Sequence, residues 1–521
     1  MFIFLPMATN GNFFAVLQKA FPKKKQAPAV WAEGGLTYSW QDLEDATAML
    51  ANLIDSLNLP AGSRIAVQVD KSVETLMLYL ATLRAGHVFL PLNTAYQNSE
   101  MDYFLGNASP AVVVCSPSNF GWVSKIAFKN KVSHVFTLDD NRQGTLLDRA
   151  ALCSRSHTPA VVAADALAVI IYTSGTTGRS KGAMLSHQNI ASNAETLKDY
   201  WNWQADDVLI HALPIFHVHG LFVAIHGALL NGSPMIWMNK FDPKRSIEHM
   251  AKGTVFMGVP TLYTRMLAES ALNKAATANM RLFISGSAPM LAETHAAWKD
   301  ATGHAILERY GMSETAMLTS NPCTPDARFN GLSERRGGTV GFPLPGVLLR
   351  VVDDANKPLL AGEIGGIQVK GPNVFMGYWQ MPEKTAEEFT SDGFFKTGDV
   401  GQQAADGYVT IVGRSKDLII SGGYNVYPAE IESFINNLDG VVESAVVGVP
   451  HPDFGEVGVA AVVLKPGSVV SPDSVLQAIK TQMANFKVPK YCEVLDALPR
   501  NIMGKVQKNV LRDAHSNRFL T

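Results

Sequence analysis

The sequence has few cysteines, no long apolar run and almost no net charge. Its four cysteines are scattered through 521 residues without a CxxC pair, which argues against a zinc site and against a disulfide-stabilised secreted fold. A formal charge of −2 gives no reason to expect nucleic acid or an anionic membrane as a partner. No segment approaches the roughly 18 consecutive apolar residues that span a bilayer. We therefore expect a cytoplasmic protein with reduced thiols.

The chain contains enough apolar material for more than one core. Hydrophobic residues make up 47% and charged residues 17%, as in globular proteins. Domains hold roughly 100–200 residues, so a chain of 521 residues is predicted to form at least two. The run GRSKDLIISGG at residues 413–423 resembles a boundary. We predict a large N-terminal domain over residues 1–415 and a small C-terminal domain over residues 416–521.

Hydrophobic patterning predicts an α/β fold. In the large domain, continuous apolar runs alternate with helical patterns, which is typical of parallel sheets covered by helices on both faces. Such runs lie at residues 64–69, 112–115 and 168–172. Between residues 337 and 402, short strands separated by Gly and Pro indicate a small antiparallel, β-barrel-like subdomain.

The C-terminal domain shows a compact α+β pattern. Its helices are expected at residues 430–437 and 471–484, and its strands at residues 443–449 and 458–464. Ser471 precedes Pro472 and is a suitable N-cap for the second helix.

A loop of glycines and hydroxylated residues directly follows one of the buried strands. The segment reads AVIIYTSGTTGRSK at residues 168–181. Glycines let backbone N–H groups approach an anion closely, the hydroxyls add donors, and the lysine adds a cation. We expect this loop to hold a triphosphate, with a surface turn as the alternative. The residues concerned are Thr173, Ser174, Gly175, Thr176, Thr177, Gly178 and Lys181.

This loop resembles the phosphate loop of the adenylate-forming superfamily, which comprises acyl-CoA synthetases, peptide-synthetase adenylation domains and luciferases. Further motifs of that superfamily follow in the same order, up to near the end of the chain. They are LPIFHVHG, SGSAP, ERYGMSET, TGD, GRSKDLIISGGYNVYP and PRNIMGKVQK. Within the superfamily the chain is most similar to malonyl-CoA synthetases, because of segments such as RSKGAMLSH, RLFISGSAP and ISGGYNVYPAEIE.

The resemblance implies a two-step reaction that uses ATP, Mg²⁺ and coenzyme A. A carboxylate attacks the α-phosphorus and releases pyrophosphate, and the CoA thiol then displaces AMP from the acyl-adenylate. Glu314, with Thr173, is implied as the Mg²⁺ site, and both are implied in catalysis. Tyr310 is implied to stack on adenine, Asp399 to bind the ribose hydroxyls, and Arg414 to contact ribose or phosphate. The other implied nucleotide-binding residues are Ser287, Ala288, Glu308, Gly311, Met312 and Ser313.

The resemblance also implies a mobile C-terminal domain. Lys505 would bridge the substrate carboxylate and the α-phosphate during the first step, and its acetylation by a lysine acetyltransferase, reversed by a deacetylase, would block that step. Lys416 is implied as the hinge for a rotation between the two steps. After the rotation, the loop with Gly422, Gly423 and Tyr424 would line the pantetheine tunnel.

The sequence predicts the acyl pocket in less detail than the nucleotide site. A second substrate carboxylate needs a buried cation, and our candidate is Arg281 at the start of RLFIS, with a structural ion pair as the alternative. For His217 we expect a position at the acyl pocket or on the thiol path, with a structural role as the alternative. For His219 we expect a structural role. The pocket lining is expected to include Met312, Met317 and residues 259–261. We expect Arg335 and Arg336, which have no assigned function, to be solvated.

Malonate or methylmalonate is the favoured acid. The alternatives are a synthetase for medium-chain or aryl acids and an adenylation enzyme that loads a carrier-protein thiol. A non-catalytic binding protein on the same fold is disfavoured, because Lys181, Glu314, Asp399, Arg414 and Lys505 are all present.

Overall fold

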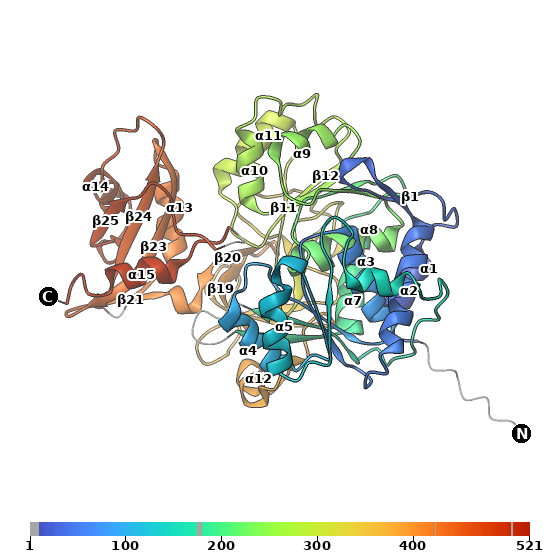
Figure 1. Cartoon of the computed structure of the whole chain (residues 1–521). Helices are drawn as coiled ribbons and strands as arrows, with labels where there is room; N and C mark the ends of the chain where they lie inside the picture. The colour runs from blue at the N-terminus through green and yellow to red at the C-terminus, as the bar shows by residue number, and fades with distance from the viewer. Residues whose placement is uncertain (1–9, 174–179, 423, 502–503, 521) are drawn as a thin grey trace, which may run out of the picture.

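The computed structural model describes residues 10–173, 180–422, 424–501 and 504–520. In Figure 1 a large α/β part, blue to orange, carries a smaller C-terminal part in orange and red at the left. The expected phosphate-loop residues Ser174, Gly175, Thr176, Thr177 and Gly178, and also Gly423, lie outside the described residues.

One mixed sheet carries the two strands that flank the phosphate loop. Over the described residues its order is β18-β8-β7-β4-β3-β5-β6. The strands are β3 (Arg64–Gln68), β4 (Val88–Pro91), β5 (Val112–Cys115), β6 (His134–Thr137), β7 (Leu167–Thr173), β8 (Lys181–Ser186) and β18 (Gly377–Tyr378). The five strands from β3 to β7 pair in parallel, as predicted, whereas β8 runs antiparallel to both β7 and β18.

A second mixed sheet has the order β15-β14-β13-β12-β11-β9-β10-β1-β2 in the part of the chain that is described. Its strands are β1 (Pro28–Trp31), β2 (Thr37–Ser39), β9 (Leu209–His211), β10 (Met235–Trp237), β11 (Val255–Gly258), β12 (Leu282–Ser285), β13 (Leu307–Met312), β14 (Ala316–Ser320) and β15 (Phe342–Pro343). The central strands are parallel, and β13, β14 and β15 form antiparallel pairs at one edge.

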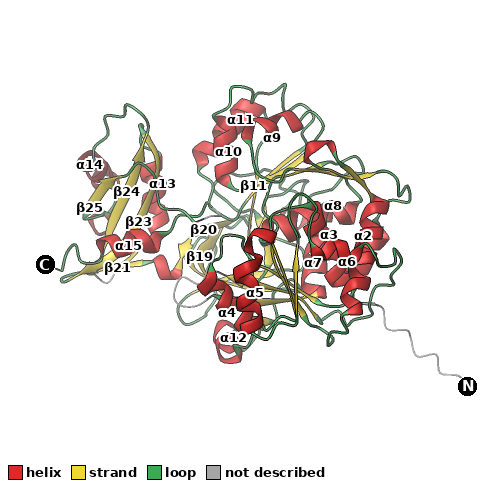
Figure 2. Cartoon of the chain, viewed as in Figure 1, coloured by secondary structure: helices red, strands yellow, loops and turns green. Residues whose placement is uncertain are grey.

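Helices cover both faces of these sheets (Figure 2). They are α1 (Phe13–Ala20), α2 (Trp40–Ser56), α3 (Val73–Arg84), α4 (Asn98–Ala108), α5 (Phe120–Lys129), α6 (Thr145–Ala150), α7 (His187–Tyr200), α8 (His226–Asn231), α9 (Pro243–His249), α10 (Pro260–Leu267), α11 (Ala292–Thr302) and α12 (Pro382–Glu388).

Strand β3 shows why its sequence is a continuous apolar run. Ile65 and Val67 belong to the main core, which includes residues of α2 and α3, whereas Ala66 belongs to a separate core formed with α4 and α5. Successive side chains of a strand point to opposite faces, so a strand that is buried on both faces needs apolar residues at every position.

The antiparallel subdomain follows, with the order β16-β17-β19-β20. Its strands are β16 (Leu348–Val352), β17 (Gly365–Lys370), β19 (Phe395–Gln403) and β20 (Val409–Arg414). In this sheet Asp399 lies opposite Arg414. The prediction of an antiparallel unit in this region is confirmed.

The C-terminal part has the α+β structure that the sequence predicts. Its strands are β21 (Ile419–Ser421), β22 (Tyr424–Val426), β23 (Val441–His451), β24 (Gly455–Leu464) and β25 (Tyr491–Val494), and its helices are α13 (Pro428–Asn436), α14 (Pro472–Gln482) and α15 (Lys508–His515). Ser471 is the N-cap of α14, since its side chain accepts from the Ser474 N–H. The α/β fold class is confirmed.

Some expectations about exposure are tested directly. Arg335 is less solvated than predicted, because it is half-buried and donates to the Ala305 carbonyl at 3.0 Å. Arg336 keeps a side chain that is 36% exposed, as predicted, although it pairs with Asp406 and lies 3.8 Å from the Tyr408 ring centre. All four cysteines are free thiols. Within the described residues, the helices are too short or too polar to cross a bilayer.

Candidate active site

The ends of the phosphate loop are held by neighbouring elements. Thr173 and Lys181 are register partners on β7 and β8, and the Thr173 hydroxyl donates to the Lys181 carbonyl at 3.4 Å. The Ser180 carbonyl accepts from the Tyr103 hydroxyl of α4 at 2.7 Å. The Lys181 ammonium lies 3.7 Å from the Glu388 carboxylate and 4.3 Å from the centre of the Tyr378 ring. A cation is therefore held where the loop re-enters the sheet.

Three of the predicted nucleotide-binding side chains lie together. The buried Asp399 carboxylate accepts a hydrogen bond from the Tyr310 hydroxyl and lies 2.7 Å from Arg414 Nε. Burial raises the pKa of Asp399, and the Arg414 charge opposes this. The cluster combines an aromatic ring with a carboxylate that can accept from hydroxyl groups, which are the features needed beside an adenosine.

Glu314 is a buried acid in the turn between β13 and β14. Its Oε1 accepts from the Tyr378 hydroxyl at 3.0 Å. Burial raises the pKa of Glu314, and the Tyr378 hydrogen bond and the charges of Arg414 and Lys181 oppose this. The described residues contain no cluster of three His, Cys, Asp or Glu side chains able to hold a metal. A metal at Glu314 would therefore need ligands from elsewhere, such as phosphate oxygens and water.

The turns around Glu314 and Ser287 are tightly built. A Cβ on Gly311 would lie 1.8 Å from the Ala316 carbonyl oxygen, so this position requires glycine. The Met312 N–H donates to the Thr315 hydroxyl at 3.3 Å, and Ser313 lies in the same turn. Ser287 adopts a φ of 70° in the loop that follows β12, a strained conformation that is typical of functional sites. Ala288 is its half-buried neighbour.

Arg309 is a buried cation that sequence analysis did not select. It lies on β13 next to Tyr310, so the two side chains leave opposite faces of the strand. Its Nε and Nη2 atoms have no hydrogen-bond partner among the described residues. A Cβ on Gly286 would lie 2.6 Å from the guanidinium, so glycine makes room for it. Burial lowers the pKa of Arg309 to about 9, which leaves it charged at neutral pH.

Two neutral histidines adjoin Arg309. Burial, reinforced by the charges of Lys505 and Arg309, lowers the pKa of His217 to about 3. The pKa of His219 is also well below its usual value, because of burial and the charge of Arg309. His219, for which we expected only a structural role, lies 3.3 Å from the Ser287 hydroxyl at the first residue of a buried π-helix, His219–Ile225. It therefore belongs to the site region.

Arg281, our candidate for binding a second carboxylate, lies elsewhere. It forms an ion pair with buried Asp207, with contacts of 2.6 and 3.0 Å. Arg281 precedes β12, whereas Ser287 follows its carboxyl end, where ligands bind in α/β sheets. The contacts support the alternative of a structural ion pair, and they correct our choice of Arg281, because its charge is already neutralised at the wrong end of the strand.

Lys505 reaches this site from the C-terminal part. Its loop is held by Asn501, whose side chain accepts from the Lys505 N–H at 3.0 Å. A Cβ on the preceding Gly504 would lie 3.4 Å from the Thr261 hydroxyl, one of the expected pocket residues. Burial and Arg414 lower the pKa of Lys505, and Asp399 and Glu314 oppose this. The Lys505 charge thus lies among the charges of the large domain.

Comparison with models of known protein families shows to which family the chain belongs. The model of the AMP-binding enzyme family matches residues 17–379, more than half of the chain, and that of the AMP-binding enzyme C-terminal domain matches residues 430–505. The chain belongs to the AMP-binding enzyme family. The predicted relationship to the adenylate-forming superfamily is thereby confirmed.

Relatives within the AMP-binding enzyme family act on different acids. A malonate–CoA ligase of Arabidopsis thaliana is 33% identical over 488 residues, which cover 88% of this chain and 78% of that protein. A feruloyl-CoA synthase of Amycolatopsis is 34% identical over 485 residues, with coverage of 92% and 94%. ATP-bound MatB of Rhodopseudomonas palustris is 52% identical, with a TM-score of 0.94 and coverage of 98% and 100%.

The chain superimposes better on the ATP-bound MatB structure than on the ligand-free one. Ligand-free MatB, at the same identity and coverage, superimposes less well on this chain, with a TM-score of 0.84. The Lys505 charge lies near Asp399 and Glu314, whereas Gly422 and Tyr424 contact residues of the C-terminal part. The Gly422 N–H donates to the Phe454 carbonyl at 2.8 Å, and Tyr424 is exposed and stacks on Phe486.

We expect Glu308 to make the stability of this AMP-binding enzyme dependent on pH. It is buried, and burial raises the pKa of its carboxyl from 4.5 to about 8. Between these values the unfolded chain loses the proton while the folded chain keeps it, so stability present below pH 4.5 is lost as the pH rises towards 8. We expect Glu308→Gln, which cannot ionise, to reduce the fall in Tm over this range by a few degrees.

Thermal unfolding at a series of pH values checks this prediction. Glu248→Gln is the matched control, because Glu248 is exposed on α9. Parallel Tm curves for wild type and Glu308→Gln would contradict the prediction.

Proposed function

We propose that this AMP-binding enzyme is an ATP-dependent malonate–CoA ligase that forms malonyl-CoA, AMP and pyrophosphate through malonyl-adenylate. The broader class, an AMP-forming acyl-CoA ligase, agrees with the CoA ligases among its relatives. The choice of malonate rests on one observation, the buried and unpartnered guanidinium of Arg309.

A buried charge without a partner costs several kcal/mol. Arginine can bind a carboxylate through two parallel hydrogen bonds, so an acid with a second carboxylate would neutralise Arg309. His217 and His219 are neutral and add no competing charge. One malonate carboxylate would lie near Arg309 while the other faces Lys505, whose pKa is lowered in part by the Arg309 charge. Methylmalonate would satisfy the same cation.

In the first half-reaction, the chain supplies cations and donors where negative charge gathers. Lys505 would stabilise the charge between the attacking carboxylate and the α-phosphate, while Lys181 would bind the outer phosphates. Tyr310 and Asp399 would hold adenosine together with Arg414. Glu314 and Thr173 would hold Mg²⁺ with oxygens of ATP. When bound, Mg²⁺ supplies positive charge that neutralises the phosphates.

In the second half-reaction, a different face of the C-terminal domain would line the site, namely the face that carries the loop with Gly422, Gly423 and Tyr424. We propose a rotation at Lys416, which lies in the short turn Ser415–Asp417 directly after β20. The rotation would bring Gly422, Gly423 and Tyr424 to the site to line a path for the pantetheine arm. The same path would serve the alternative of a carrier-protein thiol.

Regulation and location are part of the proposal. Lys505 keeps solvent-accessible surface although burial lowers the pKa of its ammonium, and we propose that a lysine acetyltransferase acts on it when the C-terminal domain turns away, since acetylation removes its charge. The free thiols fit a reducing compartment such as the cytoplasm.

An acid panel tests the proposed function. ATP–pyrophosphate exchange and CoA-thioester formation are measured with malonate, methylmalonate, acetate, butyrate, octanoate and coumarate. We expect the highest kcat/KM with malonate. A preference for octanoate or coumarate would contradict malonate but leave the ligase class intact, and exchange without CoA-thioester formation would favour the carrier-protein alternative.

A further inference from the structure

Tyr378 joins the two charged side chains that flank the proposed phosphate site. We propose that Tyr378 is a positioning residue: its hydroxyl orients Glu314 for the metal, and its ring face holds Lys181 for the phosphates. The proposal rests on the proposed use of ATP and Mg²⁺. It adds to that site a residue that lies outside every motif identified in the sequence.

The two contacts of Tyr378 come from different parts of its side chain. The hydroxyl donates to Glu314 Oε1 at 3.0 Å, and the Lys181 ammonium lies 4.3 Å from the ring centre. A hydrogen bond to one carboxylate oxygen leaves the other oxygen free to bind a cation. The ring attracts the ammonium without itself neutralising the charge, so an anion would compete for Lys181 with Glu388, which lies 3.7 Å away.

The backbone around Tyr378 ties both partners to the same segment. Gly377 and Tyr378 form β18, which pairs with Met184 and Ala183 of the strand that begins at Lys181. Two residues before β18, the Phe375 N–H donates to the Glu314 carbonyl at 2.8 Å. The segment 375–378 thus contacts the backbone of two elements, the turn that contains Glu314 and the strand β8 that begins at Lys181. The position of this segment therefore influences the distance between Glu314 and Lys181.

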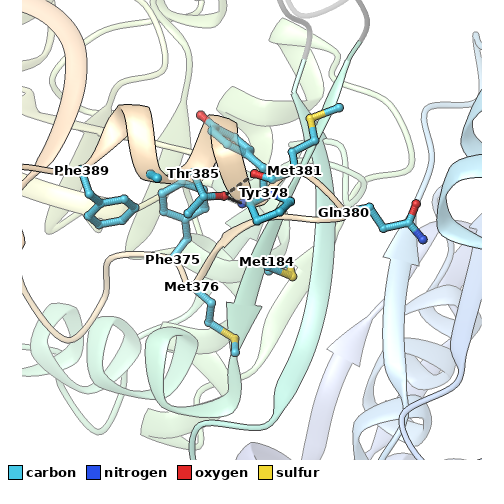
Figure 3. A pocket seen from close by; sticks show the side chains of 10 residues that line it. Met184, Phe375, Met376, Tyr378, Gln380, Met381, Thr385 and Phe389 are labelled. Carbon is cyan, nitrogen blue, oxygen red and sulfur yellow. Dashed lines mark hydrogen bonds between the residues drawn. The ribbon is translucent and has the colours of Figure 1, made fainter.

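Helix α12 holds Tyr378 from the other side. The Tyr378 N–H donates to the Thr385 hydroxyl at 2.9 Å, and Glu388 of the same helix lies 3.7 Å from the Lys181 ammonium. An apolar cavity of about 660 Å³ adjoins the ring, with Phe375, Phe389 and Met184 in its wall (Figure 3). Among the described residues, Glu314 is the hydrogen-bond acceptor that orients the phenol.

These contacts predict separable effects of the ring and the hydroxyl. Tyr378→Phe keeps the ring below Lys181 and removes the donor to Glu314. Hydrogen-bond partners of metal ligands typically contribute 10- to 100-fold to metal affinity or activity. We therefore expect the gain in ATP affinity on adding Mg²⁺ to fall by about tenfold or more, while ATP affinity in EDTA stays at the wild-type value. Tyr378→Leu removes both contacts and should weaken both.

Calorimetric titration of the full-length protein with ATP, with Mg²⁺ or with EDTA, measures these effects, and electron paramagnetic resonance of Mn²⁺ reports the metal directly. Tyr200→Phe is the matched control, because Tyr200 donates to Asp326 at 3.0 Å outside the site. The control should retain the wild-type Mg²⁺ effect.

A double-mutant cycle separates positioning from a general effect on folding. If Tyr378 acts through Glu314, Tyr378→Phe should change the Mg²⁺ effect little in a Glu314→Gln background. An equal loss in both backgrounds, or an unchanged Mg²⁺ effect in Tyr378→Phe, would overturn the inference. Failure of the wild-type protein to bind ATP would instead overturn the proposed function.

Discussion

Replacing Lys505 by alanine is expected to abolish adenylate formation while largely sparing the second half-reaction. The Lys505 charge lies among Arg414, Asp399 and Glu314 in the arrangement seen here. Loss of one group that stabilises developing charge typically costs about 10²- to 10³-fold in rate. We expect ATP–pyrophosphate exchange to fall by roughly this factor, whereas thioester formation from preformed acyl-adenylate should change by less than about threefold.

The two half-reactions are measured separately, with malonate and ATP for the first and with synthetic malonyl-adenylate and CoA for the second. Lys508→Ala is a suitable control, because Lys508 lies three residues further along the chain and pairs with Glu432. Equal loss of both half-reactions in Lys505→Ala would indicate that Lys505 is structural.

Replacing Arg309 by methionine is expected to remove the preference for malonate. Methionine keeps much of the bulk and removes the charge that would bind the second carboxylate. Hydrogen bonds to charged groups are worth about 1.5–3 kcal/mol each, so kcat/KM for malonate should fall by roughly tenfold to a hundredfold or more. The value for butyrate, which has no second carboxylate, should stay similar or rise.

The same substitution should stabilise the ligand-free protein, because it removes a buried cation without a partner. Steady-state kinetics with both acids and thermal unfolding without ligands test the two parts. Arg281→Met is the matched control: it breaks the ion pair with Asp207, so it should lower Tm and leave the ratio of malonate to butyrate unchanged. If Arg281→Met changes this ratio and Arg309→Met does not, the assignment is wrong.

Several site residues could be predicted from the sequence because short segments specify them. A buried strand followed by a glycine-rich loop indicates where phosphates bind, and YGMSET and TGD place Tyr310, Glu314 and Asp399 in recognisable contexts. The structure brings Tyr310 and Asp399 into contact. Such motifs can be recognised in a sequence because the geometry of a turn, and how closely two backbone segments approach each other, depend on local residues. Gly311 is an example, since a Cβ at this position would clash with the Ala316 carbonyl.

The sequence by itself thus determined the α/β class, the family and the residues expected to hold the nucleotide. Only the tertiary structure distinguishes Arg281 from Arg309, because the sequence does not show whether an arginine at the start of a strand or within it has a partner for its charge. Asp207, distant in sequence, neutralises Arg281, whereas Arg309 is left without a described partner. Tyr378 likewise contacts Glu314 across 64 positions of sequence. The physical reason is that the partner of a buried charge is chosen by the packing of distant segments, which local sequence patterns do not contain.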